Sequence, residues 1–261
     1  MRKYKLNECY FKEIDTENKA YWLGFITADG CVVGNKLTIR LKRSDKQHIM
    51  KFLHDIQSEH LIKEDEKTIR GKTFPSCYTS VYSKKMVENL KDLEVLPNKS
   101  TREIPWSGPK HLLRHYFRGL VDGDGCISKF KTKSSPNHQW YVGLCGSPKI
   151  LDSFSSCVKD QIGYDSQAIR RQGRIFTLCY RGVNKPQAVA KFLYSDCSVF
   201  LERKKLLAEE LSGISCLSRR QLSVDEIVSL YSKFGTWKDV AGHLNMDIKT
   251  FYRRRKELRL I

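Results

Sequence analysis

Two aspartates stand at matching places in a short segment that occurs twice in the chain. The copies read YWLGFITADGCV (21–32) and YFRGLVDGDGCI (116–127), 95 residues apart, and the aspartates are Asp29 and Asp124. Carboxylate oxygens are hard ligands that suit Mg²⁺. If the two copies come together, their like charges require either a cation between them or a raised pKa. The pair therefore predicts a divalent-metal site formed by one acid from each copy.

Both copies have the apolar periodicity of a buried helix. Small residues lie four apart in each, Gly24 with Ala28 and Gly119 with Gly123. A glycine inside a helix costs about 1 kcal/mol relative to alanine, so its use twice indicates a packing requirement. We expect the two helices to pack directly against each other around a pseudo-twofold axis. Gly30 and Gly125 are expected to end them in a left-handed conformation.

The elements that must position this pair follow in the same order after each copy. In the first half, strands are expected near 37–42, 66–70 and 76–82, with helices near 48–56 and 84–93. In the second half, strands are expected near 127–133 and 139–146 and a hairpin at 168–180, with helices near 150–162, 185–194 and 199–211. Residues 131–139 are expected to form an extra polar loop. The pattern predicts an α+β fold of two pseudo-symmetric αββαββα halves, residues 1–108 and 109–212, each with an antiparallel sheet.

The segments WLGFITADG (22–30) and FRGLVDGDG (117–125) closely resemble the two signature motifs of the LAGLIDADG homing endonucleases. The resemblance covers roughly residues 16–212. The first copy departs from the family motif at Thr27, where the family often has an aspartate. The second copy has this aspartate, Asp122. The resemblance implies that Asp29 and Asp124 bind Mg²⁺, with Mn²⁺ as a substitute, and that Lys99 and Lys204 are the catalytic lysines near the metals. It also implies cleavage of both strands of DNA with short 3′ overhangs, and mobility of an encoding intron or free-standing gene.

The formal net charge of the chain is +18. Such a charge predicts a polyanionic partner, with nucleic acid first. The resemblance implies that the two sheets form a saddle in the major groove of a double-stranded DNA target, where arginine can pair with guanine. The basic residues on the strands expected to contact DNA are Arg40, Lys42, Arg43, Arg70, Lys72, Lys129, Lys131, Lys133, Arg170, Arg171, Arg174 and Arg181.

The C-terminal residues have a separate pattern. Residues 213–221 are interpreted as a linker, and residues 222–261 as three short helices, with Ser223 and Asp247 as N-caps. Glu226 stands at capping-box spacing from Ser223. The segment resembles a helix-turn-helix unit with a tight turn at Asn245-Met246. Its third helix would be the recognition helix, and its residues available for DNA are Lys249, Thr250, Arg253 and Arg254.

The resulting hypothesis is a monomeric, site-specific double-strand DNA endonuclease. A cleavage-inactive DNA- or RNA-binding protein on the same fold, such as a transcriptional regulator or an intron maturase, stays open as the alternative. No membrane partner is expected, because no stretch approaches the roughly 18 apolar residues of a membrane span and no amphipathic basic helix that could bind a membrane surface is recognised outside the C-terminal segment. The nine cysteines lack paired spacing. They are interpreted as mostly small buried hydrophobes in a reducing intracellular compartment, either the cytoplasm or an organelle matrix.

Overall fold

A computed structural model describes residues 4–69, 71–97, 102–132, 135–214, 223–244 and 246–257. The chain divides into two compact units. One contains residues 1–128 and 140–212, and the other contains residues 129–139 and 213–261. Both repeated segments belong to the first unit. None of the helices within the described ranges has the length and apolar character that crossing a membrane requires.

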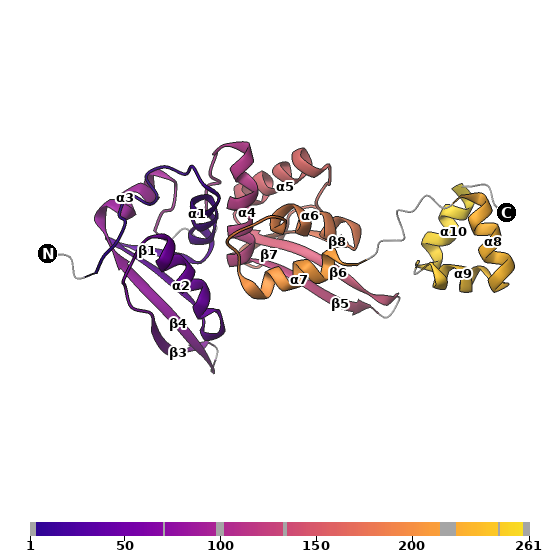
Figure 1. The fold of residues 1–261 in the computed structure, drawn as a ribbon, viewed down its shortest axis with the longest axis horizontal. Coiled ribbons are helices and arrows are strands. Elements are labelled where there is room, and N and C mark those ends of the chain that lie inside the picture. Colours follow the sequence, from indigo (N-terminus) through magenta and orange to yellow (C-terminus); the bar gives the residue numbers. More distant parts are fainter. Residues whose placement is uncertain are drawn as a thin grey trace. The chain divides into compact units, whose positions relative to one another are not determined.

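Two helices carry the repeated segments, α1 (Glu17–Asp29) and α4 (Lys110–Asp124). They lie side by side in Figure 1, and their backbones approach closely at Gly24 and Gly119. A Cβ atom built on Gly24 would lie 1.9 Å from the carbonyl oxygen of Tyr116, and one on Gly119 would lie 2.1 Å from that of Tyr21. Neither position has room for a side chain, which confirms the predicted direct packing of the two helices.

The first sheet follows α1. Its strands are β1 (Gly30–Val33), β2 (Lys36–Lys42), β3 (Lys63–Ile69) and β4 (Lys72–Tyr82), antiparallel in the order β1-β2-β4-β3. Its helical elements are η1 (Arg43–Asp45), α2 (Lys46–Asp55) and α3 (Lys84–Asp92). Along β2, Leu37, Ile39 and Leu41 are buried toward the helices. Lys36, Thr38, Arg40 and Lys42 alternate with them and define the face that we call the open face of this sheet.

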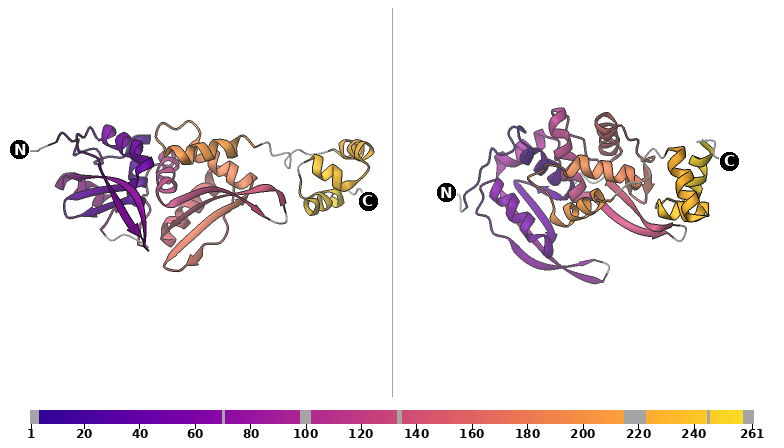
Figure 2. Two further views of the ribbon diagram at one scale, coloured as in Figure 1. Left: turned by 90° about the horizontal axis from the view of Figure 1, so that it is seen from below. Right: turned by 45° about the vertical axis from the view of Figure 1, so that its right-hand side comes forward.

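The second sheet repeats this order. Its strands are β5 (Gly125–Thr132), β6 (Ser135–Gly146), β7 (Arg170–Gln172) and β8 (Ile175–Gly182), in the order β5-β6-β8-β7. Its helices are α5 (Pro148–Ile162), α6 (Asn184–Tyr194) and α7 (Glu202–Ser212). Trp140, Val142 and Leu144 are buried. Figure 2 shows the helices gathered on one side of the sheets, and the α+β fold with two four-stranded antiparallel sheets is confirmed.

Three local predictions were wrong. Residues 131–139 are not mainly a loop, because β5 extends to Thr132 and β6 starts at Ser135. Gly30 and Gly125 are extended, at φ −75° and −96°, because each chain passes directly from helix into strand. Glycine is still required there, since a Cβ atom on either residue would lie 2.6 Å from the carbonyl oxygen four residues earlier.

The cysteines are less buried than predicted. Only Cys77 and Cys157 are buried among the eight that are described, and none of the eight forms a disulfide. The reason is strand alternation. Cys31 pairs with Thr38 in the register of β1 and β2, so it belongs to the open face and is exposed.

The C-terminal segment forms α8 (Val224–Phe234), α9 (Trp237–His243) and α10 (Ile248–Glu257). The capping box of Ser223 and Glu226 is present, and Asp247 accepts a hydrogen bond from the Lys249 amide at 3.1 Å. The helices enclose a small core of Ile227, Val240, Ala241, Leu244, Met246 and Phe251. Residues 215–221 of the predicted linker, residue 222 of the predicted helical segment and Asn245 of the predicted turn lie outside the described residues.

Candidate active site

The two aspartates of the repeated segments are the last residues of α1 and α4. The close contact between these helices continues to their ends. A Cβ atom on Gly123 would lie 2.3 Å from the Cβ of Ala28 and 3.4 Å from the backbone nitrogen of Asp29. Asp124 follows Gly123 directly, so the structure brings the backbones of Asp29 and Asp124 together. Asp29 is half-buried and Asp124 is exposed.

The surroundings of the pair favour a cation. Both helices point their C-terminal ends, which carry partial negative charge, at this place. In the described part of the chain, no three or more His, Cys, Asp or Glu side chains form a group that could hold a metal ion. Mg²⁺ is commonly held by one or two carboxylates together with substrate phosphates and water. The donor set therefore fits Mg²⁺ that is shared between the protein and a phosphate-bearing substrate.

Lys204, a residue of α7, contacts the C-terminal end of α4. Its side chain is buried, and Nζ donates to the carbonyl oxygens of Val121, Asp122 and Gly125 at 2.5, 2.7 and 2.8 Å. The last carbonyls of a helix have no partner within the helix, and Lys204 supplies one. Burial lowers the pKa of Lys204 to about 8, although Asp122 and Asp29 favour its charged form. Lys99 lies outside the described residues.

Asp122 lies in the core of the protein and not at the candidate metal site. Its carboxylate is fully buried and accepts hydrogen bonds from the Tyr21 hydroxyl (2.7 Å), the Tyr194 hydroxyl (2.6 Å) and the Leu201 amide (2.7 Å). Burial raises its pKa, whereas Lys204 and the three donors oppose the rise. At the matching position Thr27 donates to the carbonyl oxygen of Leu23 at 2.8 Å. The threonine at position 27 thus replaces a buried carboxylate with a hydroxyl that bonds within its own helix. It does not alter Asp29, two residues later.

A partly buried ion pair joins the two motif helices, α1 and α4. Arg118 is completely buried, and its Nη2 donates to the Glu17 carboxylate at 2.7 Å. Its other donors reach the carbonyl oxygens of Val199 (2.9 Å) and Leu193 (3.0 Å). This pair is not among the predicted residues. The signal for it in the sequence is an arginine within the apolar run FRGLV.

The open face of the first sheet holds the basic residues predicted there. Register places Arg40, Lys42 and Lys72 on this face, and Arg43 follows in η1. The same alternation adds three lysines that were not predicted, namely Lys36, Lys63 and Lys67. A groove of about 960 Å³ runs over this face, and Asp29, Arg40, Lys42, Lys67 and Arg203 are among its lining residues. The groove thus joins the site of Asp29 to a basic surface.

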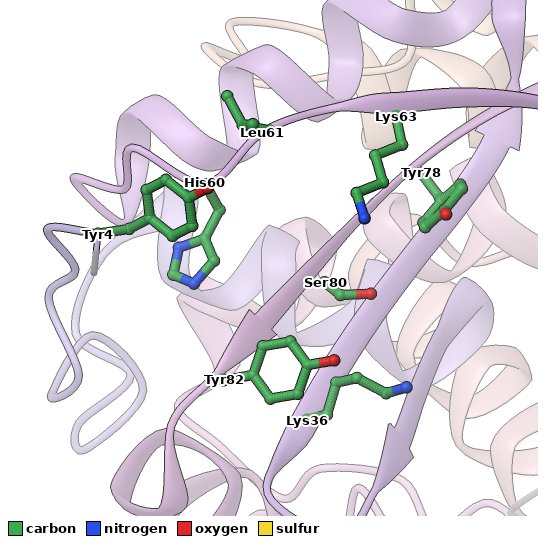
Figure 3. Close-up of a pocket in the computed structure, with 8 residues that line it drawn as sticks. All are labelled: Tyr4, Lys36, His60, Leu61, Lys63, Tyr78, Ser80 and Tyr82. Carbon is green, nitrogen blue, oxygen red and sulfur yellow. The ribbon is translucent and has the colours of Figure 1, made fainter. Parts of the chain in front are cut away.

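A second hollow of about 650 Å³ lies on the same face. Figure 3 shows Tyr78, Ser80 and Tyr82 projecting from β4 beside Lys36 and Lys63, with Tyr4 against His60 at the rim. Lysines and tyrosine hydroxyls are donors suited to phosphate oxygens. Both hollows on the open face of the first sheet are therefore lined in part by positive charge and hydrogen-bond donors.

The second sheet carries fewer basic residues on its matching face than expected. Arg181 pairs with Tyr141 and Arg170 with Thr177, which places both on the face that faces away from the helices. Arg171 pairs with Phe176, on the side of the buried Leu178. The pleat of β5 likewise puts Lys129 and Lys131 on the side of the buried Ile127. The expectation of one shared basic face does not hold for these three residues, because successive side chains alternate across a strand.

The remaining predicted contacts lie at turns, in the C-terminal helices or beyond the described residues. Arg174 follows the turn residue Gly173, and Lys249 and Arg253 are exposed on α10. Arg70, Lys133 and the side chains of Thr250 and Arg254 lie outside what the structure describes.

No protein-family model and no curated protein matches the sequence of the chain. Solved structures do resemble it in fold, among them the following three. The meganuclease I-SmaMI bound to uncleavable DNA superposes with a TM-score of 0.55 at 10% identity, covering 83% of this chain and 97% of its own. The homing endonuclease I-WcaI bound to its DNA recognition sequence gives 0.52 at 11%, covering 76% and 90%. The LAGLIDADG meganuclease I-AabMI bound to uncleaved DNA gives 0.50 at 13%, covering 82% and 96%. The chain has the LAGLIDADG fold.

In this LAGLIDADG fold the two motif helices are α1 and α4, and the motif aspartates are Asp29 and Asp124. At 10–13% identity the likeness concerns the path of the backbone. Arguments about activity therefore rest on the residues of the site itself.

Proposed function

We propose that this protein is a site-specific endonuclease that cuts both strands of double-stranded DNA with a divalent metal ion and leaves short 3′ overhangs. The observation that carries the proposal is the backbone contact between α1 and α4, which brings Asp29 and Asp124 together. The three similar structures are nucleases bound to DNA, which supports DNA as the partner. One chain supplies both halves, so the active form is expected to be a monomer.

Each group of the site has a separate task in this proposal. Asp29 and Asp124 would hold Mg²⁺, with Mn²⁺ as a substitute. Bound metal ions activate water as a nucleophile and stabilise the negative charge that develops on the leaving oxygen. Lys204 holds the end of α4 through three carbonyls and thereby orients Asp124. The basic groove beside Asp29 would orient the DNA backbone.

A cleavage-inactive DNA- or RNA-binding protein on the same fold is the second candidate. The observation that favours it is the engagement of Lys204, whose ammonium group donates to three backbone carbonyls and is a positioning group in this structure. A regulator or maturase would need the basic open face and no hydrolysis.

In vitro cleavage decides between the two. We would incubate the purified chain with a randomised double-stranded DNA library and Mg²⁺ or Mn²⁺, then sequence the new ends. The wild type is expected to cut at one family of sites, and Asp29→Asn and Asp124→Asn are expected to bind these sites without cutting. Asp152→Asn, an exposed carboxylate on α5, is the matched control and should cut normally. A wild type that selects DNA and never cuts it with either metal would establish the second candidate instead.

The C-terminal unit is proposed to be a helix-turn-helix that makes an additional DNA contact. Its α9 and α10 are short consecutive helices, and Lys249 and Arg253 are exposed on α10. A recognition helix presents such residues to the major groove. Combined Lys249→Ala and Arg253→Ala substitution should weaken binding of the selected DNA about tenfold or more. Lys233→Ala on α8 removes a positive charge from the same unit and should have a smaller effect; equal losses would argue against recognition by α10.

A further inference from the structure

Arg40, on the open face of the first sheet, is held by three neighbouring side chains. Its Nη1 donates to Asp65 at 2.5 Å and to the Ser76 hydroxyl at 2.7 Å. Ser76 in turn donates to the same carboxylate. The guanidinium carbon lies 4.2 Å from the centroid of the Tyr78 ring. A long flexible side chain is thus fixed in one orientation by three neighbours, which removes most of the entropy cost of ordering it on binding.

Arg40 lies close to Asp29 of the candidate active site. Its neighbour in β2, Ile39, pairs with Gly30, the residue that follows Asp29. Arg40 and Asp29 line the same groove. A nucleic acid that lies in this groove with a phosphate at Asp29 would present a nearby base edge to Arg40.

The guanidinium retains donors for such a contact. Both hydrogen bonds to protein use Nη1, and within the described ranges no acceptor bonds to Nη2 or Nε. The planar guanidinium carries five donors in a rigid fork. Two parallel donors match the O6 and N7 acceptors of guanine in the major groove, the commonest specific contact between protein and DNA.

β6, the second strand of the second sheet, carries no arginine or lysine on its open face near the end of α4. The residues on that face are Tyr141, Gly143 and Cys145, which alternate with the buried Trp140, Val142 and Leu144. Gly143 lies beside Gly125, the residue that follows Asp124, since a Cβ atom on Gly125 would be 2.8 Å from the Gly143 carbonyl oxygen. None of these side chains has the paired donors of a guanidinium, so none makes an equivalent demand on the base opposite it.

We propose that Arg40 is a specificity-determining residue that reads one guanine in the half-site bound by the first sheet, with Asp65, Ser76 and Tyr78 holding it ready. The proposal deepens the DNA-binding function proposed above and rests on it. It makes the recognition site asymmetric, because the second half-site has no requirement for guanine at the matching position.

The test is selection by binding. Variants are compared in an Asp124→Asn background, so that cleavage does not deplete the bound DNA, with a randomised double-stranded library and Mg²⁺. The parent should select a site with a fixed guanine in one half. Arg40→Ala should lose about tenfold to 100-fold discrimination at that position alone. Arg40→Lys should lose it too, because lysine keeps the charge and lacks the fork. Asp65→Asn weakens the charged hydrogen bond that orients Arg40, so this variant should lose part of the discrimination.

Lys67→Ala is the matched control, since Lys67 lines the same groove. It should weaken binding evenly across sequences, as loss of a phosphate contact does. Thermal unfolding of Arg40→Lys near that of the parent excludes misfolding as the cause of lost preference. An unchanged base preference in Arg40→Ala overturns the inference and leaves the nuclease proposal standing. A parent that selects no sequence at all contradicts both, and the cleavage assay reports separately on hydrolysis.

Discussion

Three aspartates of the repeated segments differ only in their surroundings. Asp122 is buried and accepts three hydrogen bonds, Asp29 is half-buried at the end of α1, and Asp124 is exposed at the end of α4. A buried carboxylate with several donors stabilises the fold, because removing it leaves those donors unpaired. The two at the helix ends can meet a cation and a phosphate. Residue type alone does not separate the two roles.

Asp122→Asn tests this difference. The amide group presents a donor where the carboxylate accepts bonds from Tyr21, Tyr194 and the Leu201 amide. We expect a loss of about 2–4 kcal/mol in the free energy of unfolding, measured by urea denaturation. Asp124→Asn should change it by less than about 0.5 kcal/mol, as surface substitutions do. Similar losses for the two variants would contradict the assignment of Asp122 to the core.

His48 predicts how stability depends on pH. It is buried beside the Tyr21 hydroxyl, with 2.9 Å between Nε2 and the oxygen. Burial lowers its pKa to about 3, with Lys51 and Arg203 acting in the same direction. The unfolded chain therefore binds a proton on this histidine between its ordinary pKa of about 6.5 and about 3, and the folded chain does not. The free energy of unfolding therefore has its full contribution from His48 above about pH 6.5. As the pH falls from there toward about 3, this contribution decreases by roughly 1.4 kcal/mol per pH unit.

The measurement is urea unfolding at several pH values between 7 and 4. His48→Gln keeps a hydrogen-bonding side chain and removes the titration, so its stability should fall less steeply than that of the wild type. His115, whose pKa burial lowers to about 4, contributes in the same direction and stays in both proteins. Parallel curves for the two proteins would mean that His48 is not the group responsible.

At the scale of the elements, the contact between α1 and α4 determines the site. Gly119→Ala would place a Cβ atom 2.1 Å from the Tyr21 carbonyl oxygen. We expect the helices to separate, with a loss of about 1–3 kcal/mol from overpacking and loss of DNA cleavage. Gly242→Ala in α9 is the control, since nothing lies within 4 Å of its added methyl group, and it should be neutral or slightly stabilising. A stable, fully active Gly119→Ala protein would disprove the tight packing.

Lys204 links another element, α7, to the end of α4. Lys204→Met would leave the carbonyl oxygens of Val121, Asp122 and Gly125 without this donor. We expect a loss of about 2–4 kcal/mol in stability together with reduced cleavage. Lys191→Met, an exposed lysine on α6, should change neither. A purely catalytic lysine would instead abolish cleavage at unchanged stability, so thermal unfolding and cleavage are measured on the same samples.

At the scale of the whole molecule, the net charge of +18 predicts strongly salt-dependent DNA binding. Each phosphate that a protein contacts releases counterions and adds about 0.9 to the slope of log affinity against log salt concentration. Lys36→Ala and Lys63→Ala should each lower this slope by roughly one unit, because both lie on the open face. Lys159→Ala on α5, away from that face, should leave it unchanged. Fluorescence anisotropy with the selected DNA at several salt concentrations measures the slopes.

Local patterns in the sequence were sufficient to determine the repeated elements. The two copies, their helical spacing and their small residues predicted α1, α4 and their direct contact, because each depends on residues a few positions apart. The capping box at Ser223 and Glu226 followed in the same way. The cap conformations of Gly30 and Gly125 were missed, because glycine is used there for close approach and not for a left-handed backbone.

Only the tertiary structure decided which side chains meet. Arg171 and Arg170 are neighbours in sequence and belong to opposite faces, because strand pairing sets the register and the pleat then alternates the side chains. Arg40 acquires its partners Asp65 and Ser76 from β3 and β4, and Lys204 finds the end of α4 some 80 residues earlier in the chain. Such contacts depend on the folded path of the backbone. The composition of the motifs determined that two acids recur, and the packing of two glycine-bearing helices determined that they lie together.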